Sequence, residues 1–254
     1  MVRSVVLVCG VLLLLGAGSA FALGPIDLTA GQTGVVSGVD GTIWGSNITQ
    51  PTGTGVYEPF LRVQAEGTES GFNTDAGPQP PLDTKAGIWT HSVQWNELAT
   101  VNINGTDYYS FQLDANEQQS GTRSLITLDA LQIYTGTDPS LTSLGGLGNP
   151  LYDLDGTSNQ TVYIETALKP GSGTDDLTLY IPKSFFAGVN GTDYMVFYTQ
   201  FGLADGVDPG FQSGATFEEW RAVTGGNEVP EPGTMVLLGS GLIGLVGTRF
   251  RRKK

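Results

Sequence analysis

Cysteine and histidine are almost missing from this 254-residue chain, which contains one of each, Cys9 and His91. A single cysteine forms no intramolecular disulfide, and zinc sites draw mainly on cysteine and histidine ligands. A Ser-His-Asp triad would have to be built on His91, and no Gly-x-Ser-x-Gly elbow accompanies it in residues 23–227. We therefore expect His91 to have a structural role.

Basic residues are also scarce in the body of the chain. Six of the 12 Lys and Arg residues lie near the two ends, so residues 23–233 hold six basic and 25 acidic residues, a net charge of −19. Such a domain repels nucleic acid and anionic lipid, and neither is expected as a partner. Two interpretations remain, a self-repelling soluble surface or a site for a divalent cation, with calcium the first candidate because the available ligands are hard oxygens.

The N-terminus has the three parts of a secretory signal peptide. Arg3 gives a positive start, residues 5–15 form an apolar core, and Ala20-Phe21-Ala22 is a small-x-small cleavage site. We expect residues 1–22 to direct export through the Sec machinery and to be removed after Ala22, which also removes Cys9.

The C-terminus combines an apolar segment with a basic end. Residues 234–248 carry no charge and would form a helix about 22 Å long, against a hydrocarbon core of roughly 30 Å, so the predicted transmembrane helix is a marginal span. The alternative is a core helix with a solvated tail, but five cations directly after an apolar run favour a membrane edge. This basic stop consists of Arg249, Arg251, Arg252, Lys253 and Lys254.

Pro230-Glu231-Pro232, the apolar segment and the basic end occur in this order at the extreme C-terminus. Together they resemble the PEP-CTERM protein-sorting domain, the signal recognised by the membrane transpeptidase exosortase. The resemblance implies that residues 228–254 hold the protein in the inner membrane transiently and are cut off near Pro230-Glu231-Pro232. It further implies an exported cell-surface or extracellular protein, whose ectodomain has no assigned activity.

Between these signals, short strand patterns are separated by Gly, Asp, Asn and Ser, and no long helical periodicity is present. We expect residues 23–227 to form one all-β domain, a jelly-roll-like β-sandwich. Strands are predicted at residues 42–44, 56–65, 87–93, 109–113, 124–134 with a bulge near Asp129, 161–167, 176–181 and 195–201, and single helical turns at 95–98 and 183–187, while residues 216–223 close the domain.

One pentapeptide, Asn-Gly-Thr-Asp-Tyr, occurs twice, at residues 104–108 and 190–194. Asn-Gly is the strongest short signal for a hairpin turn, because both residues tolerate positive φ. The sequence therefore predicts two hairpins with similar turns. Their flanking residues differ, which favours shared turn chemistry over an internal repeat.

Carboxylates are the most plentiful chemical groups. The candidate calcium ligands lie in three acidic loops, and they are Asp114, Asn116, Glu117, Asp153, Asp155, Asp175 and Asp176. The alternative is that these side chains cap their own turns. An acid/base pair of the glycosidase kind is also compatible with so many carboxylates. Aromatic residues including Trp44, Trp89 and Trp95 suit either a sugar-stacking platform or a core.

These observations predict a non-enzymatic surface or matrix protein, associated with the exopolysaccharide or biofilm layer. The alternative is a carbohydrate-binding or adhesive module, with calcium as its candidate ion. An extracellular glycoside hydrolase is the third hypothesis. No catalytic residue is assigned.

Overall fold

The computed structural model describes residues 25–30, 36–37, 40–46, 58–118, 124–156, 159–168, 175–202 and 209–224. The predicted signal peptide with Ala20 and Ala22, the Pro230-Glu231-Pro232 motif, the apolar segment and the basic stop lie outside these residues. Within the described parts of the chain, no helix has the length and apolar character needed to cross a membrane. The described residues form β-strands and short 3-10 turns, which confirms the all-β prediction.

The first sheet has seven strands. Its main path runs β1 (Ile26–Asp27), β12 (Val162–Glu165), β10 (Leu125–Gly136), β14 (Tyr194–Phe201) and β6 (Glu69–Phe72). Two short strands pair at its side, β11 (Tyr152–Asp153) with β10 and β7 (Val93–Gln94) with β14. All its pairs are antiparallel except β1 with β12. The register of β10 against β14 shifts between Leu128 and Ala130, so the bulge predicted near Asp129 is confirmed.

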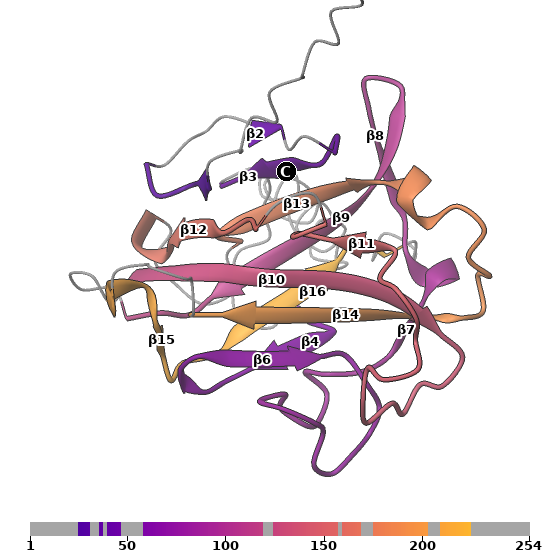
Figure 1. Ribbon diagram of the computed structural model, residues 1–254, viewed down its shortest axis with the longest axis horizontal. Helices are drawn as coiled ribbons and strands as arrows, with labels where there is room; N and C mark the ends of the chain where they lie inside the picture. The colour runs from indigo at the N-terminus through magenta and orange to yellow at the C-terminus, as the bar shows by residue number, and fades with distance from the viewer. Residues whose placement is uncertain are drawn as a thin grey trace, which may run out of the picture.

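The second sheet also has seven strands. Its path runs β2 (Val36–Ser37), β3 (Ile43–Gly45), β13 (Leu177–Pro182), β9 (Thr106–Ala115), β16 (Glu218–Ala222) and β4 (Leu61–Val63), and β8 (Thr100–Ile103) pairs with β9. A small third sheet joins β5 (Glu66–Gly67) to β15 (Ser213–Gly214). In Figure 1 the long strands β10 and β14 lie in front of β9 and β16.

The two large sheets share one hydrophobic core. Phe197 of the first sheet contacts Phe111 and Trp220 of the second, with ring centroids 5.1 and 4.9 Å apart. Phe111 and Trp220 alternate with polar neighbours along their strands, as expected where one face of a sheet packs inward, whereas Phe197 lies between Val196 and Tyr198. Aromatic contacts of this geometry contribute beyond the apolar area that they bury.

Most predicted strands are present with changed boundaries, the prediction for 56–65 being reduced to the three residues of β4, but residues 87–93 are not a strand. Only Val93 belongs to β7, while Gly87 to Ser92 form bends and loop. The loop leaves Ile88 and Trp89 among the exposed apolar side chains. The two predicted helical turns are 3-10 helices, η1 (Trp95–Glu97) and η4 (Lys183–Phe186). Two further 3-10 turns are η3 (Thr166–Leu168) and η5 (Pro209–Phe211).

Candidate functional site

The first Asn-Gly turn builds one wall of a groove. It joins β8 to β9 in a two-residue hairpin, with Ile103 paired to Thr106. Asn104 and Gly105 have φ of 52° and 87°, the left-handed conformation that this hairpin class requires. The Asn102 side chain accepts a hydrogen bond from the Gly105 N–H at 3.1 Å and donates one to Asp107 at 2.7 Å. The predicted first hairpin is confirmed.

The second Asn-Gly segment contributes to the opposite wall, but it is not a hairpin. It forms a turn between η4 and β14, closed by the Asp193 N–H donating to the Asn190 carbonyl at 3.0 Å. The strands that pair with the start of β14 are β7 and β10, both from elsewhere in the chain. The predicted second hairpin is therefore wrong, because turn chemistry reports a change of direction and not the pairing partner.

Backbone hydrogen bonds attach η1 to this second turn. The Trp95 N–H donates to the Asp193 carbonyl at 3.0 Å, and the Asn96 N–H donates to the Gly191 carbonyl at 2.9 Å. Gly191 and the Gly105–Asp107 turn line the same groove, so the fold brings the two copies of the pentapeptide to one site.

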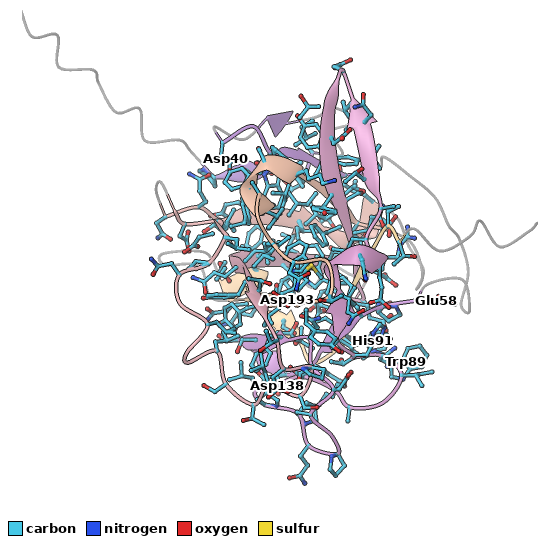
Figure 2. The ribbon with its side chains drawn as sticks, turned by 90° about the vertical axis from the view of Figure 1, so that its right-hand side faces the viewer. Asp40, Glu58, Trp89, His91, Asp138 and Asp193 are labelled. Atoms are coloured by element: carbon cyan, nitrogen blue, oxygen red, sulfur yellow. The ribbon has the colours of Figure 1, made fainter. Side chains whose placement is uncertain are left out.

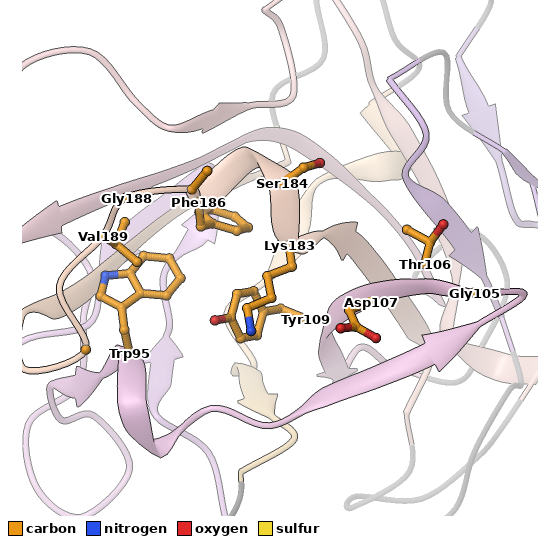
Figure 3. Close-up of a pocket in the computed structure, with 12 residues that line it drawn as sticks. Trp95, Gly105, Thr106, Asp107, Tyr109, Lys183, Ser184, Phe186, Gly188 and Val189 are labelled. Carbon is orange, nitrogen blue, oxygen red and sulfur yellow. The ribbon is translucent and has the colours of Figure 1, made fainter.

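The groove has a volume of about 650 Å³ and an aromatic floor. Trp95 contacts Phe186 and Tyr109, with ring centroids 4.8 and 5.7 Å apart. Figure 3 shows Trp95 and Phe186 at one end, Asp107 and Thr106 at the other, and Lys183 between them. Burial raises the pKa of the Tyr109 hydroxyl, which stays protonated and can donate a hydrogen bond.

This lining offers a cation, a carboxylate and the three hydroxyl groups of Thr106, Tyr109 and Ser184 around apolar rings. Such a surface is suited to a polar ligand with an apolar face. The rings of Trp95, Tyr109 and Phe186 are themselves buried, so they form a floor and not an exposed stacking platform. Among the groove residues Asp107 supplies the carboxyl group, whereas a glycosidase uses two.

The other aromatic candidates mostly belong to the core. Trp44, Tyr152 and Trp220 are fully buried, and Tyr108 is buried, as the core interpretation requires. Trp89 is the exception, with 37% of its surface exposed. It lies on the outside of the molecule near His91 (Figure 2). The Nδ1 atom of His91 lies 2.9 Å from the Ser92 carbonyl oxygen, so the ring makes a local loop contact.

The acidic loops separate into two groups. Asp153 and Asp155 lie at β11 in the first sheet, where Asp153 Oδ1 accepts the Asp155 N–H at 3.1 Å and Asp155 Oδ1 accepts the Gln160 N–H at 2.7 Å. Burial raises the pKa of Asp155, with the Asp153 carboxylate adding to the effect. Both side chains therefore stabilise a local turn.

The other two loops meet in the second sheet. Asp176 accepts the Ala115 N–H at 2.9 Å, and Asp175 accepts two hydrogen bonds from Arg221, at 3.2 and 2.7 Å. Asp114 is buried, and the Asn116 amide donates to the Phe217 carbonyl at 3.3 Å.

Glu117 receives the Gly214 N–H on both carboxylate oxygens, at 2.9 and 3.1 Å. Within the described ranges, no three Asp, Glu, His or Cys side chains converge as a metal ion would require.

The described residues thus define an all-β domain with an acidic composition and a groove lined by two turns of the same sequence. Comparison with protein families finds the PEP-CTERM protein-sorting motif at residues 228–253. The chain carries a PEP-CTERM signal, which directs exosortase-dependent sorting of an exported protein. Comparisons with curated proteins and with solved structures each found no match.

Proposed function

We propose that this is a non-enzymatic cell-surface or extracellular-matrix protein, exported by the Sec machinery and released from its C-terminal helix by exosortase. The observation that carries the proposal is the sorting motif at residues 228–253. The acidic, cysteine-poor composition of the preceding domain supports it, because a strongly charged surface stays soluble outside the cell without disulfides. We also propose that the two large sheets form a jelly-roll-like β-sandwich.

Processing is tested by the mass of the mature protein. Mass spectrometry of the surface-released chain should give a C-terminus near Pro230-Glu231-Pro232 and an N-terminus after Ala22. Changing Pro230, Glu231 and Pro232 to alanine should leave the intact chain in the membrane fraction, whereas alanine at Gly225, Gly226 and Asn227 should not. Recovery of Lys254 in the released wild-type protein refutes processing.

For the ligand, we propose a neutral polysaccharide bound along the groove of Figure 3. Sugars present hydroxyl groups around apolar ring faces, which suits the polar rim of Lys183, Ser184 and Asp107 above an aromatic floor. The net charge of −19 over residues 23–233 disfavours an anionic polymer.

A retention assay on immobilised polysaccharides, run with calcium and with a chelator, tests this assignment and the predicted calcium dependence. Lys183→Met and Asp107→Asn should each weaken binding by about tenfold, the effect of losing roughly 1.4 kcal/mol of polar interaction. Lys85→Met removes the same charge outside the groove lining and serves as the control. Equal retention of all four proteins, or of none, refutes the groove as the binding site.

A further inference from the structure

Two glutamates from different sheets meet inside the domain. Glu69 is the first residue of β6 in the first sheet, and Glu218 is the first residue of β16 in the second. Both are 0% exposed. Along β16, Glu218 lies on the same face as Trp220, which is the core face, while Glu219 lies on the opposite face.

A hydrogen-bond donor reaches one side of this pair. Glu69 Oε2 accepts the Ala65 N–H at 2.8 Å. In the described structure, Glu69 Oε1 and both carboxyl oxygens of Glu218 receive no N–H or O–H group. The carboxyl groups of Glu69 and Glu218 nevertheless lie within hydrogen-bonding reach of each other. Two carboxylates have no hydrogen to share, so this contact requires a proton between them.

Among the described residues, the charged groups that act on the pair are themselves acidic and do not replace that proton. The groups that face Glu218 are Glu69, Glu117 and Asp114, and Asp83 acts on Glu69. The two nearby arginines are engaged elsewhere, Arg62 with Glu219 and Arg221 with Asp175. Burial raises the pKa of Glu218 well above its usual range, and the neighbouring carboxylates raise it further. Burial raises the pKa of Glu69 as well.

We propose that Glu218 carries a proton that it donates to Glu69 Oε1, and that this bond acts as a pH-dependent lock between the two sheets. Glu69 is the carboxylate of the pair because its Oε2 has the Ala65 N–H as a donor. Glu218 is the acid because donors to its oxygens are missing from the described residues. The lock closes one corner of the domain, where Ser213 Oγ also donates to the Ala65 carbonyl at 2.8 Å and Glu117 holds Gly214.

The sign of the pH effect follows from the raised pKa. Below the unfolded value of about 4.5, both states hold the proton and the lock contributes fully. As pH rises from there through the pKa of the folded pair, the unfolded state loses its proton first, and the domain becomes less stable. The unfolding equilibrium constant should increase by about tenfold per pH unit in this window for one proton.

The test compares the full-length chain with its Glu218→Gln variant by urea unfolding between pH 4.5 and pH 9. A glutamine amide donates to Glu69 at every pH. The unfolding equilibrium constant of the variant should therefore lack the tenfold increase per pH unit that one proton gives wild type. At alkaline pH the variant should unfold at a higher urea concentration than wild type. Glu66→Gln, an exposed glutamate in β5, should keep the wild-type slope. Equal slopes for wild type and Glu218→Gln would overturn the proposal.

A second measurement does not depend on the variant folding. Infrared spectra of the wild-type chain at neutral pH should contain the carbonyl band of a protonated carboxylic acid, shielded from exchange. Its absence would overturn the proposal. Proton release with stabilisation on adding calcium would also overturn it, because a metal ion would then occupy the position of the proton.

Discussion

Arg62 is placed where its charge and its flat shape can be tested separately. Its guanidinium carbon lies 4.1 Å from the ring centre of Trp89 and 4.2 Å from that of Phe217. Its Nε donates to Glu219 at 2.6 Å, and Nη2 forms an ion pair with the same carboxylate. The side chain of Arg62 is 17% exposed and that of Glu219 is 5% exposed, so water has limited access to the pair.

We expect Arg62→Ala to lower the free energy of unfolding by about 4 kcal/mol. Each ring contact contributes about 1 kcal/mol, and leaving the Glu219 carboxylate buried without its partner costs about 2 kcal/mol, less than for a fully buried pair. Arg62→Lys keeps the charge but loses the planar fork and the stacking, and should cost about 2 kcal/mol.

Urea unfolding of the full-length chain, followed by circular dichroism and by tryptophan fluorescence, measures these changes. Arg221→Lys is the matched comparison, because Arg221 also makes two hydrogen bonds to a carboxylate, Asp175. Arg62 contacts two rings as well, so Arg62→Lys should lose more stability than Arg221→Lys. If Arg62→Lys unfolds at the wild-type urea midpoint, the stacking argument is wrong.

Four further substitutions test two left-handed glycines and a buried asparagine that links backbone groups. Gly202 has a φ of +80°, and an added Cβ would lie 2.1 Å from the Gly67 carbonyl oxygen, so Gly202→Ala should lower the free energy of unfolding by about 3 kcal/mol or more. Gly105 has a φ of +87° but open space around it, so Gly105→Ala should lower the free energy of unfolding by about 1 kcal/mol. Urea unfolding measures both changes. Asn73 is buried and links three backbone groups, accepting the Phe197 N–H at 2.7 Å and donating to the Met195 and His91 carbonyls at 3.0 and 3.3 Å. Asn73→Ala should lower the free energy of unfolding by about 2 kcal/mol, because it leaves these backbone groups unpaired. Asn73→Asp should lower it further at neutral pH. If either variant has a thermal midpoint above that of wild type, the argument is wrong.

The strands could be predicted where the sequence alternates strongly. Residues 109–113 lie within β9, β10 begins one residue inside the predicted 124–134, and the Asn104-Gly105 turn has the conformation that its residues favour. The strand predicted at residues 87–93 is wrong because Ile88 and Trp89 are apolar but exposed, so the apolar pattern there does not indicate burial. Strand β6 was missed, because Glu-Ser-Gly-Phe has one apolar residue and weak strand propensity.

The candidate sites depended on contacts that sequence patterns do not encode. Nothing in either pentapeptide indicates that Gly191 and Gly105 line the same groove, since their strands pair with different partners. The acidic loops were recognised as calcium candidates by composition, yet Asp175 pairs with an arginine and Asp153 supports a turn. One signal was available: Glu218 is two residues from Trp220 in a strand, so a buried tryptophan places that glutamate on the core face.

The effect of salt on stability distinguishes two causes of instability at high pH, the buried Glu69–Glu218 pair and the exposed acidic residues. The net charge of −19 over residues 23–233 destabilises the folded state by repulsion between exposed carboxylates, and that repulsion is screened within about 10 Å at 0.1 M salt and about 3 Å at 1 M. Glu69 and Glu218 are fully buried and in contact, so salt screens their interaction little. Raising NaCl from 0.1 to 1 M should therefore stabilise wild type and Glu218→Gln alike at pH 8, and leave the difference between them unchanged. If that difference disappears at 1 M, its origin is the exposed charge, and the sheets are not held by a buried proton.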